Sequence, residues 1–230
     1  MNEQGNNMND NKDQDNDNDN EESIKVVLIG ESGVGKTSII SQFTKGSFNP
    51  ELMSTNGATF STKKNEFIEY KKTISFEIWD TAGQEKYRSL AKMFFKDATV
   101  ALIVYDITNK KSFEEIKQYW MNLVKENGPK EMIMYIVGNK SDLSEREAVN
   151  EEEVRNYAKS QNILFWSTSA KDATGINELF AEIGNKYLTE FKNCEEIKER
   201  KQRKKEASTV NLEKQADNNQ DNNNKRGCCG

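Results

Sequence analysis

The stretch GESGVGKTS, residues 30–38, is the part of the sequence whose residue types and spacing point most directly to chemistry. It fits the pattern G-x-x-x-x-G-K-[ST] through Gly30, Gly35, Lys36 and Thr37. Glycines here let backbone N–H groups surround phosphates, Lys36 would reach the terminal phosphates, and the Thr37 hydroxyl would bind Mg²⁺. The expected phosphate-site residues are Glu31, Ser32, Gly33, Val34, Gly35, Lys36, Thr37 and Ser38. The loop predicts a nucleoside phosphate, with base and reaction open.

A second stretch, WDTAGQE at residues 79–85, narrows the reaction. Asp80, at the end of an apolar run, is placed to hold Mg²⁺ through water. Gly83 can bring a backbone N–H against a γ-phosphate, and Gln84 can orient an attacking water. In isolation the stretch also fits a simple turn. Behind a phosphate loop it favours hydrolysis of a nucleoside triphosphate.

Two further stretches, GNKSD at 138–142 and TSAK at 168–171, indicate which base is bound. The carboxylate of Asp142 can accept two hydrogen bonds from guanine, which adenine cannot offer in that geometry. Asn139 would contact the base and tie its loop to the phosphate loop, and the stem of Lys140 would lie along the ring. From the second stretch the expected contacts are Ser169, Ala170 and Lys171, with the Ala170 N–H donating to guanine O6.

The elements that must position these residues are apolar runs alternating with helical patterns. The runs are IKVVLIG, TISFEIWD, VALIVYD, MIMYIVGN and ILFWSTSA. Four are nearly continuous, as buried parallel strands are, whereas the second alternates as a half-exposed or edge strand would. Between them SFEEIKQYWMNLVKEN forms an amphipathic helical pattern after Ser112 as N-cap, and residues 150–161 and 175–188 behave likewise. The order predicts an α/β fold with a mostly parallel, doubly wound sheet flanked by helices. Each motif follows a strand, where such sheets bind ligands.

Together GESGVGKTS, WDTAGQEKYRSL, IVYDIT, GNKSD and TSAK resemble a small GTPase of the Ras superfamily, and specifically the Rab family, over about residues 23–190. The pattern STNGATF at 54–60 favours the endosomal subgroup. The resemblance implies the P-loop small-GTPase fold and a switch that binds GTP or GDP with Mg²⁺ and hydrolyses GTP slowly. Gln84 and Lys36 would serve catalysis, and Thr37, Thr55 and Asp80 would hold the metal.

The resemblance also assigns the segments that change with the nucleotide. Thr55 would join the Mg²⁺ shell only when a γ-phosphate is present, within switch segments 47–60 and 81–95. Phe48 corresponds to the aromatic side chain that packs edge-on against guanine. Phe60, Trp79 and Phe94 would form the aromatic triad that effectors bind in the GTP state, although for Trp79 a place in the core is the alternative.

Several positions depart from the family pattern. Asn56 replaces the usual isoleucine after the switch threonine, Lys92 stands at a usual proline, and FFKDA at 94–98 replaces a tyrosine-rich sequence. Ser32 occupies the phosphate-loop position nearest the γ-phosphate and is compatible with attack by water. We expect Asn56 to affect effector choice and Lys92 to affect the second switch, with Mg²⁺ binding preserved.

Charge and composition divide the chain into three parts. Residues 1–22 carry eight acidic residues and one lysine within a net charge of −5 for the whole chain, and we expect a disordered Asn/Asp-rich tail. Residues 23–192 form the expected G domain. Residues 193–230 form a flexible hypervariable tail, whose basic run 198–205 is either a membrane-attracting patch or a solvated linker.

The tail ends in KRGCCG, with two of the three cysteines of the chain. Cys228 and Cys229 by themselves allow a vicinal disulfide, part of a metal site or lipid attachment. Three cysteines form no disulfide framework, so we expect a reducing, intracellular protein with peripheral membrane association. The resemblance implies that both cysteines carry geranylgeranyl groups, because two chains anchor firmly where one does not.

The resemblance further implies an exchange factor, a GTPase-activating protein, a GDP-dissociation inhibitor, an escort protein with its prenyltransferase, and effectors. We expect the cytoplasmic face of intracellular membranes, endosomal ones favoured, exchange with the cytosol, and no nucleic-acid partner. Two alternatives remain: a P-loop nucleotide kinase or ATPase, and a binding module without turnover.

Overall fold

The computed structural model describes residues 20–51, 55, 57–81 and 92–191. Its strands are β1 (Glu21–Ile29), β2 (Ala58–Phe67), β3 (Lys72–Thr81), β4 (Val100–Asp106), β5 (Ile133–Asn139) and β6 (Leu164–Thr168). Its α-helices are α1 (Lys36–Lys45), α3 (Lys110–Glu115), α4 (Met121–Asn127), α5 (Glu151–Ser160) and α6 (Ile176–Lys186). The 3₁₀-helical segments are η2 (Ile68–Tyr70) and η5 (Ser141–Arg146), and the π-helical segments are η4 (Ile116–Trp120) and η6 (Tyr187–Phe191).

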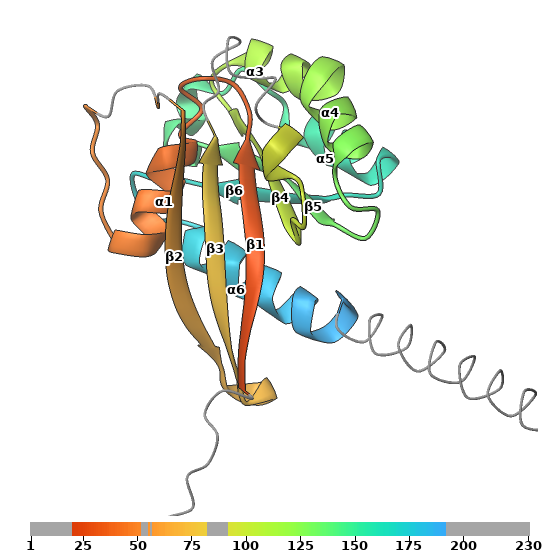
Figure 1. Cartoon of the computed structure of the whole chain (residues 1–230). Helices are drawn as coiled ribbons and strands as arrows, with labels where there is room; N and C mark the ends of the chain where they lie inside the picture. The colour runs from red at the N-terminus through yellow and green to blue at the C-terminus, as the bar shows by residue number, and fades with distance from the viewer. Residues whose placement is uncertain (1–19, 52–54, 56, 82–91, 192–230) are drawn as a thin grey trace, which may run out of the picture. The chain divides into compact units, whose positions relative to one another are not determined.

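One sheet holds all six strands, in the order β2-β3-β1-β4-β5-β6. Every neighbouring pair is parallel except β2 with β3, which form an antiparallel hairpin around η2 (Figure 1). The mostly parallel, helix-flanked sheet predicted from the alternating pattern is confirmed. Sequence reasoning missed β2, because the strand is mostly exposed and its letters ATFSTKKNEF carry little apolar periodicity.

β3 decides between the two alternatives left open for the alternating run: it is the half-exposed strand and not the edge strand. It lies between β2 and β1, and β2 forms that edge of the sheet. The alternation in its sequence is nevertheless real: Ile74, Phe76 and Ile78 are fully buried, while the residues between them are half-buried. One face of β3 is buried and the other is only half-buried, so the alternation indicates a strand with one buried face.

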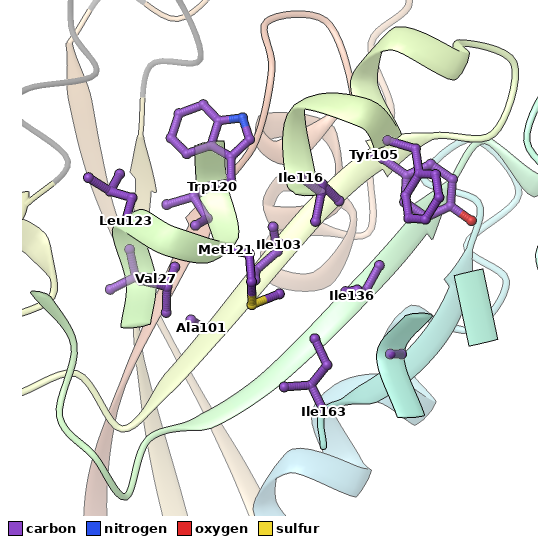
Figure 2. Close-up of a cluster of buried hydrophobic side chains, with 14 of the residues drawn as sticks. Val27, Ala101, Ile103, Tyr105, Ile116, Trp120, Met121, Leu123, Ile136 and Ile163 are labelled. Carbon is purple, nitrogen blue, oxygen red and sulfur yellow. The ribbon is translucent and has the colours of Figure 1, made fainter. Parts of the chain in front are cut away.

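Helices cover the sheet on two sides. On one, Phe43 of α1 packs edge-on against Phe76 of β3, with ring centroids 5.6 Å apart. In the register of β1 and β3, Phe76 pairs with Ile24 and Trp79 with Val27, and successive residues of a strand point to opposite faces. Val27 therefore lies on the other side of the sheet, in a hydrophobic cluster with Ile103, Ile116 and Trp120 (Figure 2). This cluster fixes β1, β4 and β5, whose ends carry the predicted motifs.

The helical segment 110–127 differs from the prediction at its start. It begins at Lys110 with Asn109 in the extended conformation before it, so Ser112 is not the N-cap. Ser112 is buried inside the first turn, and its hydroxyl donates to the Asn109 carbonyl oxygen at 2.7 Å. A π-helical turn, η4, separates α3 from α4.

The chain divides into two compact units, residues 1–176 and 177–230. The second contains α6 from its second residue onward and η6. No helix among the described residues combines the length and the apolar character needed to cross a membrane. The expected limits of the tails, 1–22 and 193–230, stay predictions.

Candidate functional site

The phosphate loop connects β1 to α1, and its backbone requires glycine. Gly30, Gly33 and Gly35 have φ values of 138°, 79° and 97°, in the region that side chains rarely allow. A Cβ atom on Gly35 would also collide with the side-chain amide of Asn139, and one on Gly30 with the backbone of Val104. The glycine spacing therefore reflects both backbone conformation and close packing.

Lys36, the first residue of α1, closes this loop. Its Nζ donates to the carbonyl oxygens of Gly30 and Glu31, both at 2.8 Å. The residue is 5% exposed. Burial lowers the pKa of Lys36 to about 8, opposed by the charges of Asp80 and Glu31. The ammonium thus lies at the centre of the loop, where an anion would restore its preference for the charged form.

Three oxygen-bearing side chains meet at the helix start. The Thr37 hydroxyl donates to Asp80 Oδ2 at 2.5 Å and lies 2.7 Å from the Thr55 hydroxyl oxygen. Thr55 Oγ1 is in turn 3.5 Å from the same carboxylate oxygen. The predicted metal residues, far apart in sequence, are brought together.

The chemistry of these donors fits Mg²⁺. Asp80 is 1% exposed, and its Oδ1 is buried without a hydrogen-bond partner among the described residues. Burial raises the pKa of the Asp80 carboxyl, and the hydrogen bond from Thr37 and the charge of Lys36 lower it. Hydroxyl and carboxylate oxygens are the ligands that hard cations prefer. A buried carboxylate oxygen without a donor is what a cation or its bound water would satisfy.

Asn139, at the end of β5, connects three segments. Its side-chain Nδ2 donates to the Val34 carbonyl oxygen at 2.9 Å. Its Oδ1 accepts hydrogen bonds from Thr168 Oγ1 and the Ala170 N–H, both at 3.2 Å. The predicted tie between the base loop and the phosphate loop is therefore present. The Ala170 N–H, expected to meet guanine O6, donates within the protein to Asn139.

Asp142 and the TSAK stretch also come together. Asp142 Oδ1 accepts a hydrogen bond from Ser169 Oγ at 2.8 Å, and Lys171 Nζ lies 3.8 Å from Oδ2. The side chain of Asp142 is 8% exposed. Ser169 Oγ also accepts from the Asp172 N–H at 3.1 Å, which fixes the hydroxyl. The carboxylate is held in one orientation, as recognition of a base edge requires.

Sequence reasoning missed two residues beside this loop. Asp106, the last residue of β4, forms an ion pair with Lys140 across 2.6 Å. Tyr105 is buried against Gly138, where a Cβ atom would lie 2.7 Å from the tyrosine oxygen. The sequence signal for both residues was their position at the end of an apolar run that predicts a buried strand. Their partners, however, depend on the pairing and register of β4 and β5.

The remaining predicted residues differ in how they lie. Ser32 and Gly33 are exposed in the loop, and Ser38 is half-buried in α1. Phe48 is also exposed. Gly83, Gln84, Asn56, Cys228 and Cys229 lie outside the described residues, so their predicted roles stay predictions.

The three aromatic residues of the predicted triad are in contact. Trp79 has its ring centroid 5.1 Å from that of Phe60 and 5.4 Å from that of Phe94. Phe60 is 51% exposed, whereas Trp79 is partly buried against the hydrophobic cluster of Figure 2. Both interpretations of Trp79 thus describe part of its environment: it belongs to the edge of the core and contacts an exposed ring.

Comparison with known proteins agrees with this geometry. The model of the Ras family matches residues 25–189. Human Ras-related protein Rab-22A is 43% identical over 164 residues, which cover 71% of this chain and 82% of that protein. Ras-related protein RHN1 of Nicotiana plumbaginifolia is 44% identical over 162 residues, and Ras-related protein Rab5 of Nicotiana tabacum 43% over the same length, each with 70% and 80% coverage.

The span matched by the family model includes the phosphate loop, the predicted metal residues and the base loop described above. The loop around the buried Lys36, the cluster of Thr37, Thr55 and Asp80 oxygens, and the oriented Asp142 carboxylate lie in the loops and strand ends predicted to form the site. The chain therefore belongs to the Ras family, in its Rab branch: it is a small GTPase that binds GTP and GDP with Mg²⁺ and acts in membrane trafficking.

Proposed function

We propose that this GTPase signals through the position of Thr55, which reports the γ-phosphate to the surrounding switch segments. The observation that carries the proposal is the meeting of the Thr37 and Thr55 hydroxyls at Asp80. Loss of the γ-phosphate would weaken the contacts that hold Thr55 beside Thr37 and Asp80. The switch segment 47–60 would then be released. Effectors would bind the GTP state through Phe60, Trp79 and Phe94.

Hydrolysis needs alignment and charge neutralisation more than covalent chemistry. Mg²⁺, when bound, supplies positive charge at the phosphates. Lys36 and the amides of residues 31–37 would hold the phosphate oxygens, and Gln84 would orient the attacking water. Residues 47–60 contain no arginine. An activating protein would therefore supply a cation in trans, worth roughly 10³–10⁵ in rate.

The decisive experiment identifies the nucleotide that co-purifies with the chain and follows phosphate release after loading with Mg²⁺-GTP. We expect GDP or GTP, and slow release that Gln84→Leu nearly abolishes while GTP binding is retained. Gln118→Leu, at an exposed position of the helical segment 110–127, is the matched control and should hydrolyse normally.

The same experiment separates the alternatives. Retention of ATP, or guanine binding that survives Asp142→Asn, would favour a nucleotide kinase or ATPase. GTP binding without phosphate release from the unmodified chain would favour a module without turnover. Unchanged hydrolysis in Gln84→Leu would remove the role of Gln84.

For the membrane cycle we propose geranylgeranyl groups on Cys228 and Cys229, attached with the help of an escort protein and extracted by a GDP-dissociation inhibitor. Two chains give firm anchoring, which one chain does not. The support is the family membership together with the paired cysteines. The double variant Cys228→Ser, Cys229→Ser should be lost from the membrane fraction of cells, whereas the control Cys194→Ser should remain in it. A double variant that still binds membranes would refute lipidation of Cys228 and Cys229.

We further propose endosomal membranes as the location, supported by the similarity to Rab-22A and Rab5 relatives. The exchange factor and effectors would act there on the switch segments. Imaging of the tagged, lipidated chain against compartment markers tests this, and a uniform location on another organelle would contradict it.

A further inference from the structure

We propose that Asp106 is a positioning residue for the guanine site, which fixes the side chain of Lys140 through an ion pair. The proposal rests on the proposed function, in which the alkyl stem of Lys140 lies along the guanine ring. Lys140 Nζ is 2.6 Å from Asp106 Oδ2, and the two side chains are 33% and 10% exposed. Such a partly shielded pair interacts more strongly than one in open solvent.

The carboxylate of Asp106 is itself held in place. Its Oδ1 accepts hydrogen bonds from the Thr108 N–H and the Thr108 hydroxyl, both at 2.8 Å. The Asp106 N–H donates to Ser112 Oγ at 3.1 Å. One carboxylate oxygen is thus engaged by the following turn, and the other is left in a fixed place for the lysine.

The sheet sets the distance between the two partners. Asp106 and Asn139 are paired residues in the parallel register of β4 and β5, and the Ile107 N–H donates to the Asn139 carbonyl oxygen at 3.1 Å. Lys140 follows directly, with φ 70° and ψ 36°, a left-handed conformation uncommon for lysine. Both the backbone and the far end of the Lys140 side chain are therefore fixed.

This arrangement has a chemical consequence for the nucleotide. A lysine stem has four flexible carbons, and an unanchored one would lose this freedom each time a base packs against it. Asp106 removes that freedom in advance and keeps the ammonium at the base end of the site, away from the phosphates. Because the base loop meets the same guanine in both states, Asp106 should slow the release of GDP and GTP equally.

The test measures release of ribose-labelled fluorescent GDP, and of a labelled non-hydrolysable GTP analogue, from the full chain with Mg²⁺ and excess unlabelled nucleotide. In Asp106→Asn we expect release of both to be about tenfold faster, the ratio that 1.4 kcal/mol represents. Lys140→Met should give a similar acceleration. The double variant should release no faster than Lys140→Met alone, because Asp106 acts through that lysine.

Two further variants make the result specific. Thr108→Val removes one of the two bonds to Asp106 Oδ1 and should accelerate release by a smaller factor, which keeps the proposal testable if Asp106→Asn does not fold. Glu151→Gln breaks an exposed ion pair with Arg155 on α5 and should release nucleotide as the unmodified chain does.

Additive effects of Asp106→Asn and Lys140→Met, or acceleration for only one of the two nucleotides, would overturn the proposal in favour of a purely structural aspartate. Normal release from both single variants would overturn it as well, while leaving the switch assignment intact. Failure of the unmodified chain to bind either labelled nucleotide would instead refute the proposed function itself.

Discussion

The side-chain amide of Asn139 donates a hydrogen bond to the carbonyl oxygen of Val34 across 2.9 Å, although 105 residues separate the two in sequence. Val34 lies in the phosphate loop and Asn139 in the base loop. The two loops predicted to hold the base and the phosphates are thus joined by a hydrogen bond, and disturbance of one should affect the other.

Asn139→Ala should therefore weaken binding of the whole nucleotide. The change leaves Val34, Thr168 and Ala170 without their buried partner, and each such loss costs about 1–3 kcal/mol. We expect GDP release at least about tenfold faster, on the conversion of 1.4 kcal/mol per factor of ten. Release of labelled GDP and the thermal unfolding midpoint are the measurements.

Asn150→Ala is the matched control for that experiment. Asn150 caps α5, where its side chain accepts from the N–H groups of Glu152 and Glu153. Loss of such a cap costs about 0.5–2 kcal/mol of stability. The unfolding midpoint should fall while GDP release stays normal; a comparable acceleration in both variants would show that Asn139 acts only through stability.

Thr37→Ala should remove the dependence of nucleotide release on Mg²⁺. In the unmodified chain we expect chelation of Mg²⁺ to accelerate GDP release strongly, because Mg²⁺ held by Thr37 and Asp80 would supply positive charge beside the phosphates. The variant should release GDP rapidly with or without the metal. Thr44→Ala, which removes a hydroxyl bonded to the Ile40 carbonyl oxygen in the same helix, should keep the Mg²⁺ effect.

Phe60→Ala should reduce binding of GTP-state partners without changing nucleotide affinity. The ring is half exposed beside Trp79, and removing it costs the fold little but deletes an aromatic contact surface. Ile68→Ala, an 85% exposed residue at the far end of the hairpin, is the control. Partners captured on the chain loaded with a GTP analogue are compared by mass spectrometry, and equal capture by both variants would contradict the prediction.

The features that could be predicted from the sequence are those that depend on residues close together in the chain. Gly35, Lys36 and Thr37 could be assigned because a phosphate loop needs consecutive backbone groups, and strand and helix flank it in the sequence. The fold class followed from four nearly continuous apolar runs, which are typical of buried parallel strands, in alternation with helical patterns. In such cases the physical constraint acts on neighbours in the chain.

The remainder depends on neighbours in space. The pairing of Asp106 with Lys140 requires the order and register of β4 and β5, which no local pattern contains. β2 was missed because an exposed edge strand needs no apolar alternation. For β3 the alternation left a half-exposed strand and an edge strand open, because both leave one face of the strand unpacked. The position of Ser112 inside the helix rather than at its cap likewise depended on where the chain turns after β4.

The close packing of Gly138 against Tyr105 changes how the letters GNKSD can be understood. A side chain at position 138 would meet Tyr105 of the neighbouring strand, because a Cβ atom there would lie 2.7 Å from the tyrosine hydroxyl oxygen. The five residues GNKSD are therefore constrained in two separate ways: Gly138 by packing in the interior, and Asn139, Lys140 and Asp142 by the ligand chemistry predicted for them. An exchange of both Tyr105 and Gly138 would therefore leave in place the three residues of this stretch to which guanine recognition is assigned.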